Sequence, residues 1–327
     1  MKFDVVYGSD DKFAKVAGVS ILSLLMSNSE NEVTIHFLDA GLSESSRNEL
    51  KRIVEEKKSH IFFYDVLTCL NKIKEHIPSM GGSFATYSRL FIADLLSQTI
   101  EKCLYIDSDT LILGDLASVF LDTNQSLMYM SYDLVPIFHK SNIGFSKADS
   151  YFNAGICLFN LDEWRKSDAS SLILNLLKEK ISYRFHDQDI LNILFKGRIE
   201  VLDLRFNVMS QNFYFGSSRN CQWLYDLNEK NYYTEAQYKN ALRNPVILHL
   251  TSVPFLVRPW IAASNHPYLS IYRKIKNSDT WLSTLEENKD FSLRQRLLQR
   301  MCSVFPKFLS AFVITLMHKS FYKKGII

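Results

Sequence analysis

The sequence predicts an α/β protein with a doubly wound sheet, because strand-like and helix-like segments alternate from its first residues. Apolar segments at 3–7, 33–38 and 60–66 have the length of buried strands, and segments 13–26 and 43–58 between them have helical spacing. Strands joined by helices in this order form right-handed parallel crossovers. The 327 residues, 47% of them hydrophobic, suffice for one α/β domain of roughly 250 residues with an appendage.

Individual elements carry their own signals. The first strand gives way to small and acidic residues at 8–11. The helix predicted over 43–58 begins at Ser43, a favourable N-cap residue, and places its apolar side chains on one face. In the second half, the segment 151–160 predicts a strand that begins with polar and small residues, and 186–192 opens a helix with polar groups in its first turn.

Two carboxylates, Asp107 and Asp109, lie in the apolar segment 103–113, which predicts one buried strand bounded by Gly114. Residues two apart in a strand share a face, so both carboxylates are expected to point the same way. Two like charges there are unfavourable unless a cation lies between them, and a divalent metal ion meets that need. The alternative, that the pair caps a strand and faces solvent, is disfavoured because the sequence is apolar on both sides.

Doubly wound sheets bind ligands beyond the carboxyl ends of their strands, here residues 8–11 and 107–109. The sequence has neither G-x-G-x-x-G after the first strand nor G-x-x-x-x-G-K-[ST], so the phosphates of a bound nucleotide would be neutralised by the metal. His249 lies near the end of a strand predicted over 245–250. A lone histidine in a strand usually packs in a core, but with two carboxylates it is a candidate third ligand, a set that suits Mn²⁺.

The cysteine content and the charge distribution indicate the redox compartment of the protein and the kind of surface that it binds. Five scattered cysteines without a C-x-x-C pair favour neither a disulfide framework nor a thiolate zinc site, and a reducing cytosol is expected. Residues 291–327 carry seven cations, no acidic residue and many large apolar side chains, while the stretch 308–317 is well short of the roughly 20 residues that cross a bilayer. This favours helices lying on an anionic membrane. The alternative is a basic helix packed on the catalytic domain, and nucleic acid is disfavoured because no RNA-binding module is recognisable.

Five short motifs, in this order, resemble bacterial members of glycosyltransferase family 8 over roughly residues 3–272. They are Thr-Tyr-Ser-Arg-Leu at 86–90, Leu-Tyr-Ile-Asp-Ser-Asp at 104–109, Tyr-Phe-Asn-Ala-Gly at 151–155, His-Asp-Gln-Asp-Ile-Leu-Asn at 186–192 and Arg-Phe-Asn at 205–207. The resemblance implies a GT-A fold: a Rossmann-like mixed sheet flanked by helices, with a helical basic C-terminal extension. The implied boundaries are a catalytic domain at 1–275 and a membrane-associating extension at 276–327.

The resemblance also implies roles for individual residues. Asp107, Asp109 and His249 would hold Mn²⁺ or Mg²⁺ on the diphosphate of a UDP-sugar, and the cation would stabilise the leaving group. Asp187 and Gln188 are the implied catalytic residues, with Gln188 nearest the anomeric carbon. The implied donor-contacting residues are Gly8, Asp10, Arg89, Asp107, Ser108, Asp133, Asn153, Ala154, Asp187, Gln188, His249 and Arg258.

The sequence departs from the family pattern in two places. The closing segment His-x-x-Gly-x-x-Lys-Pro-Trp is longer here, with Ser252 at the glycine position and Arg258 at the lysine position. Arginine neutralises phosphate with a different geometry from lysine. Lys12 stands where relatives often have asparagine near the ribose.

The expected activity is retaining, α-linking transfer of galactose or glucose from a UDP-sugar to a saccharide of a bacterial surface glycan, such as lipopolysaccharide, lipooligosaccharide, capsule or O-antigen. The acceptor is expected to be lipid-linked, and the enzyme peripheral at the cytoplasmic face of the plasma membrane. Two alternatives are a haloacid-dehalogenase-type phosphatase, suggested by Asp-Ser-Asp-Thr-Leu at 107–111, and a non-catalytic GT-A domain that binds a glycan or partner. The phosphatase motif normally ends the first strand of its domain, which disfavours that reading.

Overall fold

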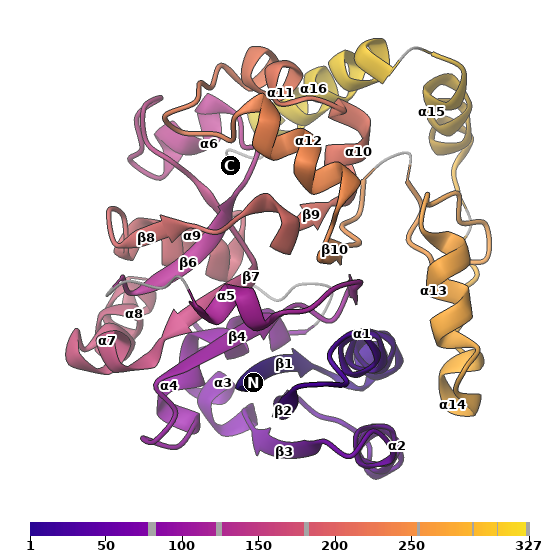
Figure 1. Ribbon diagram of the computed structural model, residues 1–327. Coiled ribbons are helices and arrows are strands. Elements are labelled where there is room, and N and C mark those ends of the chain that lie inside the picture. Colours follow the sequence, from indigo (N-terminus) through magenta and orange to yellow (C-terminus); the bar gives the residue numbers. More distant parts are fainter. Residues whose placement is uncertain are drawn as a thin grey trace. The chain divides into compact units, whose positions relative to one another are not determined.

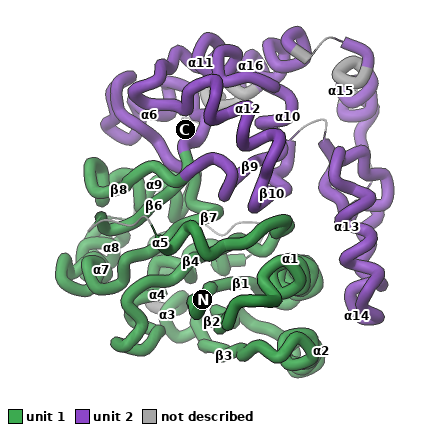
Figure 2. The backbone as a smooth tube through the Cα atoms, viewed as in Figure 1, with its two compact units in different colours: residues 1–131, 153–202 green, residues 132–152, 203–327 purple. Residues whose placement is uncertain are grey.

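The computed structural model describes residues 1–77, 83–121, 126–179, 183–253, 256–289, 291–305 and 307–324. The chain divides into two compact units (Figure 2). Unit 1 comprises residues 1–131 and 153–202, and unit 2 comprises residues 132–152 and 203–327. The predicted boundary after residue 275 falls in the last turn of a helix of unit 2, and the predicted division into 1–275 and 276–327 stays a prediction.

Unit 1 is a mixed sheet with helices (Figure 1). Its elements are β1 (Lys2–Ser9), η1 (Asp11–Phe13), α1 (Ala14–Ser27), β2 (Glu32–Asp39), α2 (Glu44–Glu56), β3 (His60–Asp65), α3 (Leu67–Ile73), η2 (Ala85–Phe91), α4 (Ile92–Leu95), β4 (Lys102–Ile106), β5 (Thr110–Ile112), α5 (Ala117–Leu121), β6 (Met128–Tyr132), β7 (Phe152–Asn160), α7 (Leu161–Lys166), α8 (Ala169–Lys178), α9 (His186–Leu194) and β8 (Ile199–Val201). The predicted early strands and helices are present, each within two residues of its expected ends.

The main sheet has the strand order β3-β2-β1-β4-β7-β6-β8. β1, β2, β3 and β4 are parallel neighbours, whereas β7 runs antiparallel to β4 with Ile106 opposite Ile156. The carboxyl ends of β1 and β4 therefore meet at one edge of the sheet, beside the start of β7. This register brings the residues after β1, after β4 and at the beginning of β7 together.

Helices α1 and α2 show how the sequence directs packing in unit 1. In α1 nearly every residue from Ala14 to Leu25 is buried, and the hydroxyl of Ser20 meets Tyr7 OH at 3.1 Å and Thr110 Oγ1 at 2.6 Å. α2 is amphipathic: Ser43 caps it by accepting a hydrogen bond from Ser46 N, and only its apolar face is buried. In Figure 1 both helices lie to the right of the strands.

Unit 2 is mainly helical. Its elements are α6 (Ile137–Asn142), η3 (Leu204–Phe206), β9 (Val208–Met209), α10 (Ser210–Phe215), α11 (Ser218–Tyr225), α12 (Glu235–Arg243), β10 (Ile247–His249), α13 (Leu269–Lys276), α14 (Thr280–Ser283), α15 (Leu293–Val304) and α16 (Lys307–Lys324). The short strands β9 and β10 pair in parallel, with His249 opposite Met209. α16 packs against α6, α10 and α11, so the C-terminal extension is helical, as predicted, and part of it belongs to the core of unit 2.

Among the described residues, none of the helices has the length and apolar character needed to cross a membrane.

Candidate active site

Asp107 and Asp109 lie in a bend between two strands, so the prediction of one continuous strand over 103–113 is wrong. β4 ends one residue before the first carboxylate, and β5 begins one residue after the second. Between them, Ser108 Oγ donates a hydrogen bond to Gly8 O at 3.1 Å. A short hydroxyl side chain competes with strand pairing for backbone acceptors, and here it ties the bend to the end of β1.

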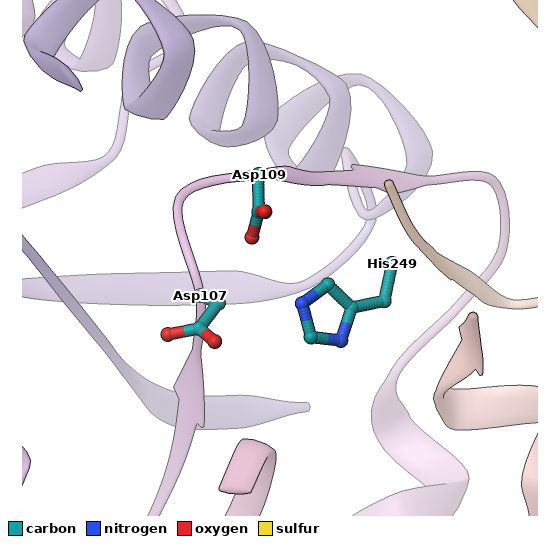
Figure 3. Close-up of side chains that lie close together, drawn as sticks. All are labelled: Asp107, Asp109 and His249. Carbon is teal, nitrogen blue, oxygen red and sulfur yellow. The ribbon is translucent and has the colours of Figure 1, made fainter. Parts of the chain in front are cut away.

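The side chains of Asp107, Asp109 and His249 lie close together (Figure 3). Each offers one ligand atom, and these atoms all lie within 4.8 Å of one another. These are the three residues that the sequence predicts as metal ligands. Two carboxylates and one imidazole are a donor set that suits a divalent cation of the Mn²⁺ type, so the residues present fit such an ion.

Arg89, in η2, connects several of the predicted site residues. Its side chain is 4% exposed. Nη2 donates to Asp107 Oδ1 at 2.8 Å, Nε lies 2.7 Å from Asp187 Oδ2 in an ion pair, and Nη1 donates to the carbonyl oxygen of Ala154. The guanidinium thus fixes a residue after β4, a residue of α9 and the backbone of β7. Its predicted contact with the donor stays a prediction.

In the ion pair of Arg89 and Asp187, burial and electrostatic attraction shift the pKa values in opposite directions. Burial works against the charged form of Arg89, but Asp107 and Asp187 outweigh it and hold the pKa of the guanidinium well above its usual value. Burial raises the pKa of Asp187 above its usual value, although Arg89 and a 2.6 Å hydrogen bond donated by Thr86 Oγ1 favour its charged form. The cost of burying these two groups is thus offset by their ion pair and by the hydrogen bond from Thr86.

Gln188 follows Asp187 in α9, and its amide oxygen has two donors. Asn153 Nδ2 donates to Gln188 Oε1 at 3.1 Å, and the backbone N–H of Ala154 donates to the same atom at 3.0 Å. Asn153 Oδ1 in turn accepts from Gly155 N at 3.0 Å. The predicted polar residues of β7 and α9 thus form one hydrogen-bonded group, which sets the orientation of the glutamine side chain.

Gly8 sits where β1 passes close to its neighbours. A Cβ at this position would lie 2.9 Å from Ser88 Oγ and 3.3 Å from Leu38 Cβ. A larger residue would therefore have to displace Ser88, which is fully buried. The glycine lets the end of β1 approach η2.

Asp10 follows β1 and caps η1, where its side chain accepts a hydrogen bond from Phe13 N at 3.3 Å. It also lines a cavity of about 200 Å³ in unit 1. The other lining residues are Ala40, Leu67, Leu70, Asn71, Lys74, Ser83, Phe84 and Ala85.

Asp133 and Arg258 belong to unit 2. Asp133 Oδ1 accepts hydrogen bonds from Leu134 N at 2.7 Å and from Gln211 Nε2 at 3.3 Å. The guanidinium carbon of Arg258 lies 5.1 Å from the centre of the Trp260 ring. Within the predicted closing segment after His249, residues 254–255 lie outside the described part of the chain.

Sequence reasoning missed two side chains that hold the site residues in place. Tyr105 OH donates to Asp107 Oδ1 at 3.0 Å, and Arg89 lies over its ring with Cζ 4.3 Å from the centroid. Thr86 binds Asp187. A signal existed for both, because Tyr105 is two residues before Asp107 on a strand, and Thr86 is three residues before Arg89 in a 3₁₀ helix, where side chains at that spacing share a face.

Comparison with known proteins assigns a family to this arrangement. A model of "Glycosyl transferase family 8" matches residues 4–261. Lipopolysaccharide 1,2-glucosyltransferase of Escherichia coli K12 is 24% identical over 284 residues, which are 85% of this chain and 78% of the relative. General stress protein A of Bacillus subtilis is 26% identical over 283 residues, 85% of this chain and 94% of the relative.

Among solved structures, galactosyltransferase LgtC in complex with donor and acceptor sugar analogs matches with a TM-score of 0.69 and 26% identity. The match covers 90% of this chain and 99% of that chain. It confirms the predicted GT-A fold. The family model covers well over half of the sequence, and the chain therefore belongs to glycosyl transferase family 8.

Proposed function

We propose that this protein is a retaining transferase that moves galactose or glucose from a UDP-sugar to a saccharide and depends on Mn²⁺ or Mg²⁺. The observation that carries the proposal is the cluster of Asp107, Asp109 and His249 in a family 8 chain. A bound divalent cation would supply electrostatic stabilisation of the departing diphosphate. The three side chains would hold that ion, and Arg258 and Ser108 would contribute to binding the diphosphate.

The relatives suggest the substrates. They include lipopolysaccharide glucosyl- and galactosyltransferases of E. coli and Salmonella typhimurium, and a galactosyltransferase structure with donor and acceptor analogs. We therefore expect the acceptor to be a sugar of a bacterial surface glycan, lipopolysaccharide, lipooligosaccharide, capsule or O-antigen, carried on a lipid and extended through an α-linkage.

The donor sugar would be held by the hydrogen-bonded group of unit 1. Asp187, Gln188 and Asn153, with Ala154, Gly8 and Arg89 around them, would contact the sugar, together with Asp133, and Asp10 would reach the uridine. One solved structure of LgtC carries a glutamine-to-glutamate change described as an active-site mutation. A glutamine thus belongs to the active site of that similar protein, and we propose that Gln188 lies nearest the anomeric carbon here.

A front-face mechanism accounts for retention with these residues. The acceptor hydroxyl would attack the anomeric carbon from the side that the diphosphate leaves, and a leaving phosphate oxygen would take the hydroxyl proton. Gln188 carries an amide, which binds the sugar without taking that proton. The two-carboxylate scheme of glycoside hydrolases is not needed.

The two alternatives fare differently. A haloacid-dehalogenase-type phosphatase is disfavoured, because its nucleophile ends the first strand of the domain, whereas Asp107 follows β4 in a family 8 chain. A non-catalytic domain would have the same fold but no turnover. The following experiment distinguishes it from an active transferase.

The test measures UDP release from UDP-galactose and UDP-glucose with and without Mn²⁺. We expect Mn²⁺-dependent release, and we expect Asp109→Ala to abolish it while the protein stays folded. Asp115→Ala is the matched control, because this exposed aspartate accepts hydrogen bonds from Asn31 and Ala117 and is not a predicted site residue. Near-normal release by Asp109→Ala would contradict the metal assignment, and a folded wild type inactive with every UDP-sugar would favour the binding domain.

We also propose that the protein binds the cytoplasmic face of an anionic plasma membrane through residues 291–327. α16 buries Ser310, Ala311 and Thr315, yet leaves apolar side chains such as Phe308, 48% exposed, on its surface. Trp223 of α11 is 64% exposed and lies beside them, with its ring 5.7 Å from that of Phe308. An exposed tryptophan beside phenylalanines and a cation-rich segment suits the interface of a bilayer.

A further inference from the structure

The motif Arg-Phe-Asn at 205–207 has no role in the proposed reaction, although it is one of the five motifs that identify the family. It forms η3 and the residue after it, directly before β9. Arg205 anchors the motif to the chain that leads into β10: its carbonyl oxygen accepts from Val246 N at 2.8 Å, and its Nε donates to Asn244 O at 2.9 Å. These contacts place Asn207 beside the end of β10.

Asn207 is completely buried, and its side chain meets the imidazole of His249. The distance from Asn207 Oδ1 to His249 Nδ1 is 3.1 Å. An amide oxygen can only accept a hydrogen bond, so the proton of this bond belongs to Nδ1. A neutral imidazole with its proton on Nδ1 carries its lone pair on Nε2.

The lone pair on Nε2 is on the side of the ring where it can serve a metal. Figure 3 shows that Nε2, the ring nitrogen that is not bonded to the carbon carrying the rest of the side chain, is turned toward Asp107 and Asp109. The opposite tautomer would place a hydrogen there and could not ligate a cation. The hydrogen bond at Nδ1 therefore selects the tautomer and fixes the rotation of the ring.

We propose that Asn207 is a positioning residue for the metal site, which holds His249 as the Nδ1–H tautomer with Nε2 ready to bind a divalent cation. The inference rests on the proposed function of the Asp107, Asp109 and His249 cluster as a metal site. Asn207 itself touches neither substrate nor metal in this scheme; it acts through His249 alone.

Nitrogen-15 NMR of the metal-free protein, labelled only at histidine, tests the tautomer directly. We expect the His249 ring, assigned from the spectrum of His249→Gln, to show the signature of a proton on Nδ1. Asn207→Ala should shift the ring toward the Nε2–H form, and Asn207→Asp, which retains an acceptor oxygen, should preserve the Nδ1–H form at mildly alkaline pH. An Nε2–H signature in the wild type would overturn the proposal even if no variant folded.

Mn²⁺ binding, followed by electron paramagnetic resonance with and without UDP, is the second readout. Asn207→Ala should weaken Mn²⁺ binding by about 10–100-fold, and Asn207→Asp should restore it to within a few-fold of the wild type. Asn231→Ala is the matched control, because Asn231 is also buried in unit 2 but binds Lys147 O and Asn228 N. Equal affinities for Asn207→Ala and this control would overturn the proposal.

The two readouts separate this inference from the proposed function. A wild type with the Nδ1–H tautomer but no Mn²⁺ binding would refute the metal site and with it the role assigned to Asn207. A wild type that binds Mn²⁺ with the Nε2–H tautomer in the metal-free state would refute only the positioning role.

Discussion

Single residues around Asp107 show how a half-buried charge can be kept in place. Its Oδ1 accepts from both Arg89 Nη2 and Tyr105 OH, so one oxygen of the carboxylate is held from two directions. Hydrogen bonds to an ionised acceptor are among the stronger ones in proteins. The orientation of Asp107 is therefore set by its neighbours in the protein, and such support strengthens metal binding at sites where the supported side chain is a ligand.

Tyr105→Phe tests whether Tyr105 helps to hold Asp107 in place, since this substitution removes only the hydroxyl group. We expect Mn²⁺ binding to weaken by roughly 10-fold, with a loss of about 1 kcal/mol in the free energy of unfolding. Tyr64→Phe is the control, because its hydroxyl meets His36 Nδ1 at 2.9 Å and no predicted site residue. Isothermal titration with Mn²⁺ and urea unfolding measure the two effects. Identical Mn²⁺ affinities in both variants would contradict the role of Tyr105.

Residue types in a pattern predicted three candidate ligands that lie together, but not what holds them in place. Asp107, Asp109 and His249 were accessible to reasoning because their chemistry is unusual in apolar segments. Asn207 was not, because an asparagine before a strand is an ordinary residue whose partner depends on the tertiary register. That register brings Ile106 opposite Ile156 and Met209 opposite His249.

At the scale of elements, the segment 103–113 shows what the pattern of apolar residues cannot predict. Its apolar residues are buried as expected, but β4 and β5 are separated by a bend that local sequence does not announce. The backbone there finds partners far away in sequence, such as Asp107 N with Gly155 O at 2.8 Å. Helix α2 was predictable because its cap and its apolar face are both local.

A second buried histidine, His266, contacts the start of α10, which in turn contacts β10. Its Nδ1 accepts from Tyr268 N at 3.2 Å, and its Nε2 lies 3.3 Å from Ser210 Oγ, at the start of α10. Ser210 Oγ in turn lies 3.4 Å from the carbonyl oxygen of His249. Burial lowers the pKa of His266 from 6.5 to about 4, so the ring stays neutral in the folded protein.

This shift predicts a loss of stability in acid. In the unfolded chain His266 becomes protonated below about pH 6.5. In the folded protein it becomes protonated only near pH 4. The contribution of neutral His266 to the free energy of unfolding is therefore complete above the pKa of the unfolded state. It declines as the pH falls, by up to about 3 kcal/mol. Urea unfolding across this range should show a shallower decline for His266→Gln than for the wild type. Parallel declines would contradict the prediction.

At the scale of the whole molecule, α16 makes a simple truncation test of membrane binding unsuitable. The helix packs against α6, α10 and α11, so deleting residues 291–327 would damage unit 2 as well as remove the proposed anchor. The sequence predicted a basic helical extension correctly, but it could not reveal that Trp223, far from that extension in sequence, lies beside it. Only the tertiary packing of α11 on α16 shows this.

A substitution of the exposed residue Trp223 tests membrane binding without removing α16 and without changing the net charge. We expect Trp223→Ser to reduce binding to vesicles that contain anionic lipid by about 10-fold, because a large apolar surface no longer enters the interface. In the wild type, vesicles should shift the tryptophan emission to shorter wavelength. Leu172→Ser, in unit 1, is the control, since Leu172 is also exposed, at 43%. Unchanged binding by Trp223→Ser, measured by co-sedimentation, would refute the contact.

The excursion of residues 132–152 into unit 2 has a consequence for synthesis on the ribosome. β7 lies between β4 and β6 in the sheet, yet it is translated after both and after the excursion. A nascent chain that has exposed only β1 to β6 therefore presents an unfilled gap at the centre of its sheet. Closing it requires non-local pairing, which is slow and leaves strand edges open, so chaperone capture should concentrate before β7 emerges.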